Sequence, residues 1–279
     1  MLGSDLVSVL RANQDVLALE HSACDITDED ALRRVFGEWR PQAVINCAAY
    51  ADVDGCEGNP AKAFAVNAQG AGNVARAAEA VGARTVYIST DYVFDGEGQR
   101  PYREDDPTNP INAYGQSKRE GEILTLKNSG PRGGHLVVRT AWLYGTHRAN
   151  FVEKVLADAE SRPEIEAVAD QISCPTWTLD LARKLAELVE TAVSGVVHVV
   201  NGGECSRYEF AQAIVERVSH PVRVRSTTWS QLRRPAKRPR YSVLASSRLE
   251  EAGIALLPPW QAALDEYLRV RQAAVVAKG

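Results

Sequence analysis

The sequence lacks the long apolar run of a membrane-spanning helix, which needs about 18 or more such residues in succession. Its first residues contain no basic segment followed by an apolar stretch, so we expect no secretory signal. The formal net charge of −4 provides no overall basic field that would attract nucleic acid. The sequence also has no internal repeat and no low-complexity tract. These absences predict a cytoplasmic protein with neither a membrane nor a nucleic acid as its main partner.

Cysteine is scarce as well, and its distribution argues against a disulfide framework. The five cysteines are an odd number, none forms a CxxC pair, and no histidine stands at metal-ligand spacing from one. We therefore expect reduced thiols and no metal site. The five positions are Cys24, Cys47, Cys56, Cys174 and Cys205.

What the sequence does contain is an alternation of strand and helix patterns. Nearly continuous apolar runs rich in β-branched residues are typical of strands buried on both faces. Helical patterns with plausible ends separate them, with Pro60 near one first turn and Thr27 or Asp28 as a candidate N-cap. The alternation predicts an α/β fold, a doubly wound parallel sheet of the Rossmann type. The expected strands are 16–20, 43–49, 85–90, 136–141 and 196–201, and the expected helices are 25–39, 59–81, 112–126 and 178–192.

The alternation weakens after about residue 145, where the chain becomes richer in proline. We expect a dinucleotide-binding domain formed by 1–145, with 178–201 returning to its sheet. Residues 146–177 and 202–279 are expected to form a smaller substrate-binding lobe over the carboxyl ends of the strands. Open α/β sheets bind their ligands at that end.

Three residues point to proton transfer at this end of the sheet. Tyr114 and Lys118 are four residues apart in a predicted helix and so share one face, and Thr90 closes a predicted strand. A phenol has an ordinary pKa of about 10, and a nearby ammonium lowers that pKa. Such a phenol can exchange a proton with a carbonyl oxygen while a cofactor supplies hydride. The Y-x-x-x-K pattern alone is common, and its position after the strand-ending S-T-D-Y makes it informative.

Longer segments carry a resemblance that spans essentially the whole chain. They include VINCAAYADVD (44–54), STDYVFDG (89–96), YGQSK (114–118), RTAWLYG (139–145) and LPPWQAAL (257–264). With CDITD (24–28), NFV (150–152), DQISCPT (170–176) and RPRYSVL (238–244), they resemble the dTDP-4-dehydrorhamnose reductases of the extended short-chain dehydrogenase/reductase superfamily.

The resemblance implies an NAD(P)H-dependent oxidoreductase that reduces the C4 keto group of a nucleotide-linked 6-deoxy sugar. The expected reaction converts dTDP-4-dehydro-β-L-rhamnose to dTDP-L-rhamnose. Tyr114 is implied as the proton donor, and Lys118 as the residue that lowers its pKa and holds the nicotinamide ribose. Thr90 is implied to bind the substrate oxygen. Asp91, Trp142, Asn150 and Arg238 are the further substrate-site residues, Arg238 through the diphosphate.

The implied cofactor is NADPH or NADH, and the choice stays open because Glu20 and His21 follow the second strand in place of a basic residue. A homodimer is compatible with the resemblance. The expected cofactor-binding residues are Gly3, Asp25, Ile26, Ala48, Ala49 and Tyr50.

Several of these residues also have a purely structural interpretation. Asp25 could cap the helix that follows it, and Trp142 could be a core residue. Asn67 could be a polar helix residue that touches a strand end. The basic segment 231–242, which contains Arg238, could be a solvated surface.

The beginning of the chain departs from the family pattern. The family opens with a buried strand and a G-x-x-G-x-x-G turn, and only Gly3 corresponds to a glycine of that turn. Two explanations stay open: the native protein begins upstream of Met1, or the chain is short and does not bind the cofactor in the usual way. In either case we expect a gap or distorted pairing in the sheet beside 16–20.

A rival to the enzymatic interpretation follows from the same departure. Members resembling the methionine adenosyltransferase beta subunit share the fold and serve as regulatory subunits without turnover. The intact set Thr90, Tyr114 and Lys118 favours an enzyme.

Overall fold

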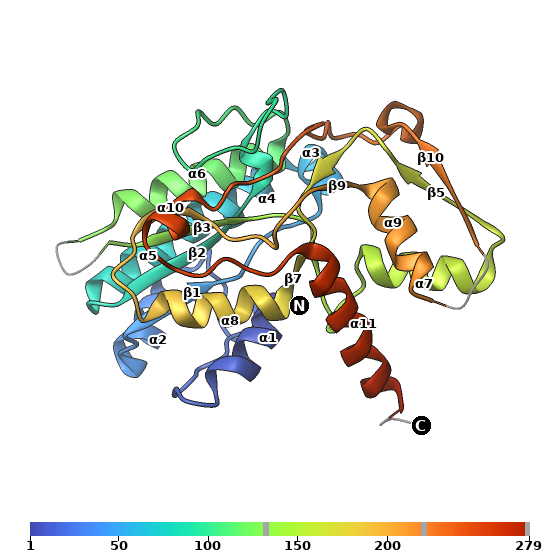
Figure 1. Cartoon of the computed structure of the whole chain (residues 1–279). Coiled ribbons are helices and arrows are strands. Elements are labelled where there is room, and N and C mark those ends of the chain that lie inside the picture. Colours follow the sequence, from blue (N-terminus) through green and yellow to red (C-terminus); the bar gives the residue numbers. More distant parts are fainter. Residues whose placement is uncertain (131–133, 219–221, 277–279) are drawn as a thin grey trace.

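A parallel sheet forms the centre of the computed structural model, which describes residues 1–130, 134–218 and 222–276. Its strands lie in the order β1-β2-β3-β8, and every neighbouring pair is parallel. The register places Thr90 opposite Thr140, so the carboxyl ends of β2 and β3 lie together. The α/β, doubly wound prediction is confirmed (Figure 1). The strands are β1 (Ala43–Asn46), β2 (Arg84–Thr90), β3 (Leu136–Thr140) and β8 (Gly195–His198).

Helices cover both faces of this sheet because each strand carries apolar side chains on both sides. On one face, Val86 and Val138 pack with Leu185 and Leu6 in a buried cluster. On the other face, Tyr87 and Val137 pack in a separate cluster. The first face is covered by α1 (Leu2–Leu10), α8 (Thr178–Val189) and α10 (Ser247–Glu251), and the second by α2 (Glu29–Trp39), α5 (Ala71–Ala80) and α6 (Ala113–Lys127).

The helix expected at 59–81 is present but is divided into three parts. Asn59 caps it and Pro60 begins it, as expected. A π-helical segment then interrupts it and turns Asn67 into the interior, where this residue has no exposed surface. The parts are α4 (Pro60–Phe64), η1 (Ala65–Gly70) and α5, and they follow the short α3 (Val53–Gly58). Of the two caps considered for α2, the structure has Asp28, whose side chain accepts from Ala31 N.

A second cluster of helices and short strands lies beside the sheet (Figure 1). Its core includes Tyr144, Trp177, Phe210 and Tyr267. The helices here are α7 (Phe151–Ser161), α9 (Arg207–Glu216) and α11 (Trp260–Val276). The paired strands are β5 (Glu164–Val168) with β10 (Arg223–Thr227), β4 (Leu143–Tyr144) with β7 (Thr176–Trp177), and β6 (Ile172–Ser173) with β9 (Cys205–Ser206). Two 3₁₀ segments complete the list, η2 (Asp91–Val93) and η3 (Trp229–Leu232).

The predicted boundary between the two units stays a prediction, and one element departs from it. Helix α10 belongs by sequence to the expected smaller lobe. In the structure its Leu249 is buried against the sheet cluster, and the helix contacts β8. The C-terminal part of the chain thus returns to the sheet before α11 begins.

The strand expected at 16–20 is wrong. These residues form no strand, and Leu17 and Leu19 are 42% and 40% exposed. An apolar run becomes a strand only when a neighbouring edge offers hydrogen bonds, and a cavity separates this segment from β1. Among the described residues β1 is an edge strand, so the expected gap beside 16–20 is confirmed.

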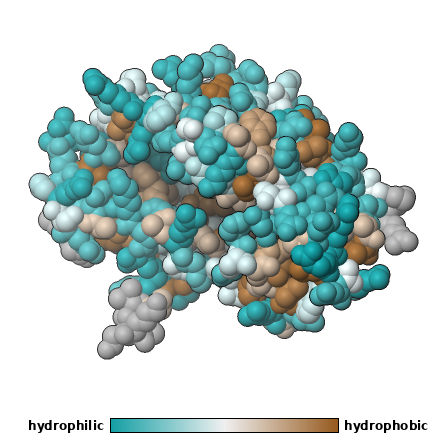
Figure 2. Space-filling view, turned by 180° about the vertical axis from the view of Figure 1, so that it is seen from behind, coloured by the Kyte–Doolittle hydropathy of each residue, from teal (hydrophilic) through white to brown (hydrophobic). Residues whose placement is uncertain are grey.

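Two surface properties complete the description. Within the described residues, no helix combines the length and the apolar character needed to cross the lipid bilayer. Figure 2 shows the face turned away in Figure 1: it is mainly hydrophilic and is hollowed near the middle, where hydrophobic residues are exposed.

Candidate active site

Tyr114 is brought to the carboxyl end of β2 by a close contact between two chain segments. Asn112 caps α6 by accepting from Gly115 N. A Cβ at Gly115 would lie 2.1 Å from Tyr92 O, so only glycine allows α6 to approach η2 this closely. As a result, the rings of Tyr114 and Tyr92 meet edge to face, with 6.0 Å between centroids.

Asp91, next to Thr90, is held by three hydroxyl groups. Its Oδ1 accepts from Thr90 Oγ1 at 3.0 Å, and its Oδ2 accepts from Ser173 Oγ at 3.1 Å and Ser242 Oγ at 2.6 Å. Burial raises the pKa of Asp91 to about 6, and these hydrogen bonds oppose the rise. The carboxylate therefore fixes the Thr90 hydroxyl at the strand end. The sequence analysis missed Ser173 and Ser242, although both lie in segments that carried the resemblance, DQISCPT and RPRYSVL.

The phenol of Tyr114 is protonated at neutral pH. Burial raises its pKa well above the ordinary value, the charge of Asp91 adds to the rise, and the hydroxyl of Thr90 opposes it. The structure thus brings Thr90, Asp91 and Tyr114 together as expected. A protonated phenol beside a fixed hydroxyl is suited to donate a proton to a substrate oxygen.

Lys118 lies one turn further along α6, and its amine points to the backbone. Lys118 Nζ donates to Ile88 O at 2.6 Å and lies 4.0 Å from the centroid of the Tyr87 ring. Burial lowers its pKa to about 7, and the charge of Glu122 opposes the shift. Burial is the largest influence on the pKa of the phenol here, and the expected lowering of that pKa by Lys118 and the contact of Lys118 with a cofactor ribose both stay predictions.

The expected cofactor-binding residues line one cavity of about 1720 Å³ between α1 and β1. Thr90, Tyr114 and Lys118 are not on its wall, but Tyr50, which is, packs in the same cluster as Tyr114. All six expected residues are on its wall, namely Gly3, Asp25, Ile26, Ala48, Ala49 and Tyr50.

Two observations make this cavity compatible with a dinucleotide. A Cβ built on Gly3 meets nothing within 4 Å, so the first turn of α1 leaves open space where a ligand can approach the backbone. In addition, the buried Asn46 Nδ2 has no hydrogen-bond partner in the described part of the chain. Its residue lines the same cavity.

Asn67 has a larger role than the sequence suggested. Its Oδ1 accepts from Tyr50 N at 2.8 Å, and its Nδ2 donates to Tyr50 O at 3.1 Å and to Ser117 Oγ at 3.0 Å. This one side chain therefore ties the cavity wall at Tyr50 to α6, the helix that carries Tyr114. The signal for it was weak, because an asparagine in a helical pattern has no motif of its own.

The structural interpretations of Asp25 and Trp142 are both wrong. Asp25 does not cap α2, since its Oδ1 accepts from Thr27 N and Thr27 Oγ1 in a tight turn at the cavity wall. Trp142 is half-buried, has a left-handed φ of 43° and lies against Arg207, whose guanidinium carbon is 3.6 Å from the ring centroid. Backbone strain of this kind is concentrated at functional sites.

Asn150 and Arg238 are largely occupied by other groups. Asn150 caps α7: its Oδ1 accepts from Val152 N and Glu153 N, while its Nδ2 donates to two backbone carbonyls. Arg238 donates to Asp54 Oδ1 at 2.6 Å and to Ala236 O at 2.6 Å. The expected substrate contacts of both residues stay predictions.

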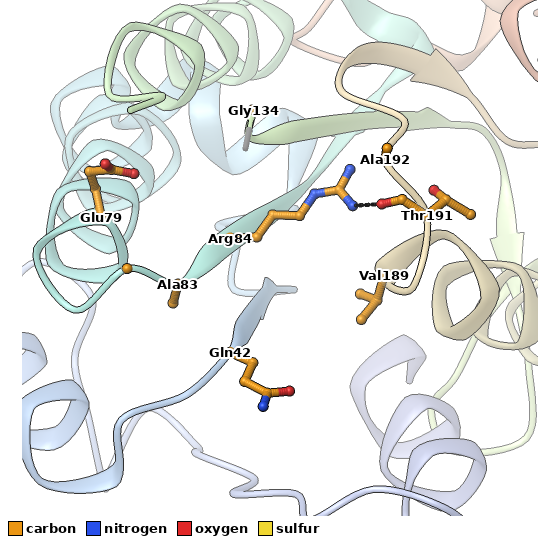
Figure 3. A pocket seen from close by; sticks show the side chains of 9 residues that line it. Gln42, Glu79, Ala83, Arg84, Gly134, Val189, Thr191 and Ala192 are labelled. Carbon is orange, nitrogen blue, oxygen red and sulfur yellow. Dashed lines mark hydrogen bonds between the residues drawn. The ribbon is translucent and has the colours of Figure 1, made fainter. Parts of the chain in front are cut away.

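A second pocket, of about 310 Å³, lies at the opposite end of β2 (Figure 3). Arg84, the first residue of β2, donates there to Thr191 O at 2.6 Å and to Leu188 O at 3.2 Å. None of the predicted site residues lines this pocket. The predicted site residues therefore lie away from this pocket, with Thr90 at the carboxyl end of β2.

Comparisons with known proteins agree with this geometry. The chain is 45% identical over 273 residues to a dTDP-4-dehydrorhamnose reductase of Streptomyces griseus, covering 95% of this chain and 89% of that protein. It is 43% identical to the spore coat polysaccharide biosynthesis protein SpsK of Bacillus subtilis, covering 98% of this chain and 95% of that protein.

A solved structure shows the same fold with a cofactor. The dTDP-4-dehydrorhamnose reductase of Bacillus anthracis, in complex with NADP, matches with a TM-score of 0.93 and 37% identity. The match covers 96% of this chain and 94% of that chain. The family model described as RmlD substrate binding domain matches residues 1–273. The chain therefore belongs to the RmlD substrate binding domain family.

Proposed function

We propose that the chain is a dTDP-4-dehydrorhamnose reductase, which reduces the C4 keto group of dTDP-4-dehydro-β-L-rhamnose to give dTDP-L-rhamnose. The observation that carries this proposal is the meeting of Thr90, Asp91 and Tyr114 beside a cavity lined by the expected cofactor residues. The relatives in Streptomyces griseus and Bacillus anthracis support the choice of substrate and of NADPH as cofactor.

The side chains divide the proton chemistry between them. Tyr114 holds the proton that the C4 oxygen receives, because burial keeps the phenol neutral. Thr90 orients that oxygen, since its hydroxyl is fixed by Asp91 at 3.0 Å. Ala48, Ala49 and Tyr50 would hold NADPH, which would supply the hydride when bound.

Two finer statements belong to the same proposal. Free thiols at all five cysteines suit a reducing compartment, which supports a cytoplasmic location. The homodimer that the resemblance allows stays a prediction.

Consumption of NADPH, followed by its absorbance with the dTDP-linked 4-keto sugar as substrate, tests the activity. We expect turnover by the unaltered chain and formation of dTDP-L-rhamnose. Removing the phenolic hydroxyl by Tyr114→Phe is expected to lower kcat by about 10²- to 10⁴-fold, the usual range for a general acid. The affinity for NADP should stay unchanged in this variant.

Two outcomes would speak against the proposal. Unchanged turnover of Tyr114→Phe would remove Tyr114 from the proton transfer. Binding of NADP and of the sugar nucleotide with no turnover by the unaltered chain would favour the regulatory alternative.

A further inference from the structure

Arg207 is a cation that lies against two aromatic rings. It is the first residue of α9, and its guanidinium carbon lies 3.6 Å from the ring centroid of Trp142 and 4.8 Å from that of Phe151. Both rings therefore hold the planar group by cation–π contact and stacking. Ser206 and Glu209 form a capping box that fixes the start of α9, and so the position of Arg207.

This guanidinium has no acceptor in the part of the chain that the structure describes. No hydrogen bond and no ion pair of Arg207 is found there, whereas Arg238 is paired with Asp54 at 2.6 Å. Burial lowers the pKa of Arg207 to about 10, with the charges of Tyr92 and Asp91 opposing the shift. The residue is partly exposed and has no counter-ion among the described residues, so an anion from outside the chain can reach the guanidinium and pair with it.

The neighbours of Arg207 identify which anion is suitable. The charge of Arg207 lowers the pKa of Asp91, which follows Thr90 in the chain, and that of Tyr92. The ring of Tyr92 packs edge to face against that of Tyr114. The oxygens of Asp91 accept from three hydroxyls, and no ion pair joins this carboxylate to Arg207 in the described part of the chain. Neither Arg207 nor Trp142 lines the cavity with the expected cofactor residues. Arg207 therefore lies near the expected substrate-site residues Asp91 and Trp142 and outside the wall of the cofactor cavity.

We propose that Arg207, held between Trp142 and Phe151, binds the diphosphate of the nucleotide-sugar substrate. The planar guanidinium presents several N–H donors at fixed angles, which match the oxygens of a phosphate. This assignment rests on the proposed function, because it takes the diphosphate from that substrate. Under this assignment Arg207 is the principal charged contact of the diphosphate, because Arg238 is already paired with Asp54.

Calorimetric titration of the full chain loaded with NADP⁺ tests the assignment, with dTDP and thymidine as the two probes. Replacing Arg207 by Met is expected to raise the Kd of dTDP by about 10- to 100-fold, the usual effect of a charged hydrogen bond. The Kd of thymidine, which lacks the phosphates, should stay within about twofold. Arg207→Lys keeps the charge without the planar fork and should give an intermediate Kd.

A matched control distinguishes the loss of a specific phosphate contact from the general effect of removing one arginine. Arg225→Met removes an arginine whose side chain is 56% exposed and paired with Glu164 at the surface. Its Kd for dTDP should equal that of the unaltered chain, because exposed pairs contribute little. If Arg207→Met fails to fold, Arg207→Lys and Arg207→Gln carry the same comparison.

The outcomes are distinct. An equal loss of dTDP and thymidine binding in Arg207→Met would reduce Arg207 to a support for Trp142 and overturn the assignment. Unchanged dTDP binding in this variant would also overturn the assignment. So would a raised Kd for NADP⁺ without a change for dTDP, because the anion that Arg207 binds would then belong to the cofactor. Selective loss of dTDP binding together with an unaltered chain that never oxidises NADPH would support the assignment of Arg207 while refuting the proposed activity.

Discussion

Burial acts in opposite directions on the acid and the base of the candidate site. It raises the pKa of the Tyr114 phenol and lowers that of the Lys118 ammonium to about 7, because in both cases the neutral form is favoured. Each shift is also a statement about stability, since the unfolded chain has ordinary pKa values.

Lys118 provides a prediction with a definite sign. Its pKa is about 7 in the folded chain and about 10.4 when unfolded, so between these values the unfolded state binds more protons. The contribution of Lys118 to the free energy of unfolding is lowest below pH 7 and rises with pH up to about 10. We expect the free energy of unfolding, relative to that of Lys118→Met, to rise by about 2 kcal/mol from pH 7 to pH 9. Urea denaturation at both pH values measures this difference, and parallel changes in the two proteins would contradict it.

At the same scale, the sequence revealed residues that belong to longer motifs and missed those that do not. Thr90, Asp91 and Tyr114 stood in recognisable segments, and the structure brings them together. Arg207 is a single basic residue at the start of a helix. The residues around it in the sequence do not indicate that Trp142, 65 positions earlier, lies against it. Such a pair is created by the fold alone.

At the scale of elements, the π-helical segment η1 connects the cofactor cavity with the catalytic helix. It places Asn67 where its amide satisfies both backbone groups of Tyr50 and the hydroxyl of Ser117. No ordinary α-helical pattern predicts this arrangement, because an extra residue in the turn changes which side chains face inward.

Replacing Asn67 by Ala should therefore affect both stability and cofactor binding. Buried polar groups at Tyr50 and Ser117 lose their partner, which is expected to cost about 1–3 kcal/mol or more. Since Tyr50 lines the cavity, the Kd for NADP should also rise. Denaturant titration and fluorescence binding measure the two effects. Asn128→Ala is the matched control, because among the described residues that side chain bonds only to Leu124 O at the end of its own helix. Loss of stability without any change in Kd would limit Asn67 to a structural role.

The strands show which elements a sequence can predict. Continuous apolar runs identified β1, β2, β3 and β8, because strands buried on both faces are apolar throughout. The same rule failed for 16–20, where the apolar residues have no strand edge beside them. It also missed the parallel pair β5 and β10, in which Arg223, Arg225 and Glu166 are exposed. Pairing between distant segments depends on packing that local composition does not show.

At the scale of the whole molecule, the cavity between α1 and β1 couples cofactor binding to stability. A ligand that binds only the folded chain stabilises it by RT ln(1 + [L]/Kd), about 2.7 kcal/mol at a concentration of 100 Kd. Most of the groups that line this cavity come from α1, β1 and the segments between them. NADP bound there would therefore join the N-terminal helix to the sheet edge, and we expect it to raise the melting temperature of the full chain.

Gly3 allows this coupling to be tested without disturbing the chain itself. A methyl group at Gly3 meets nothing within 4 Å, and alanine is favoured over glycine in a helix by up to about 1 kcal/mol. Gly3→Ala should therefore keep or raise the stability of the free protein. Because the methyl group enters the cavity, the same variant should show a smaller stabilisation by NADP than the unaltered chain.

Gly37→Ala is the matched control for this experiment. Gly37 is also a helical glycine with nothing within 4 Å of an added Cβ, but it lies on the exposed side of α2 and does not line the cavity. Thermal unfolding of both variants with and without NADP separates helix propensity from ligand binding. An equal NADP-dependent shift in Gly3→Ala, Gly37→Ala and the unaltered chain would mean that the first turn of α1 does not face the cofactor. The cavity would then have to bind the dinucleotide through β1 and the following loop alone.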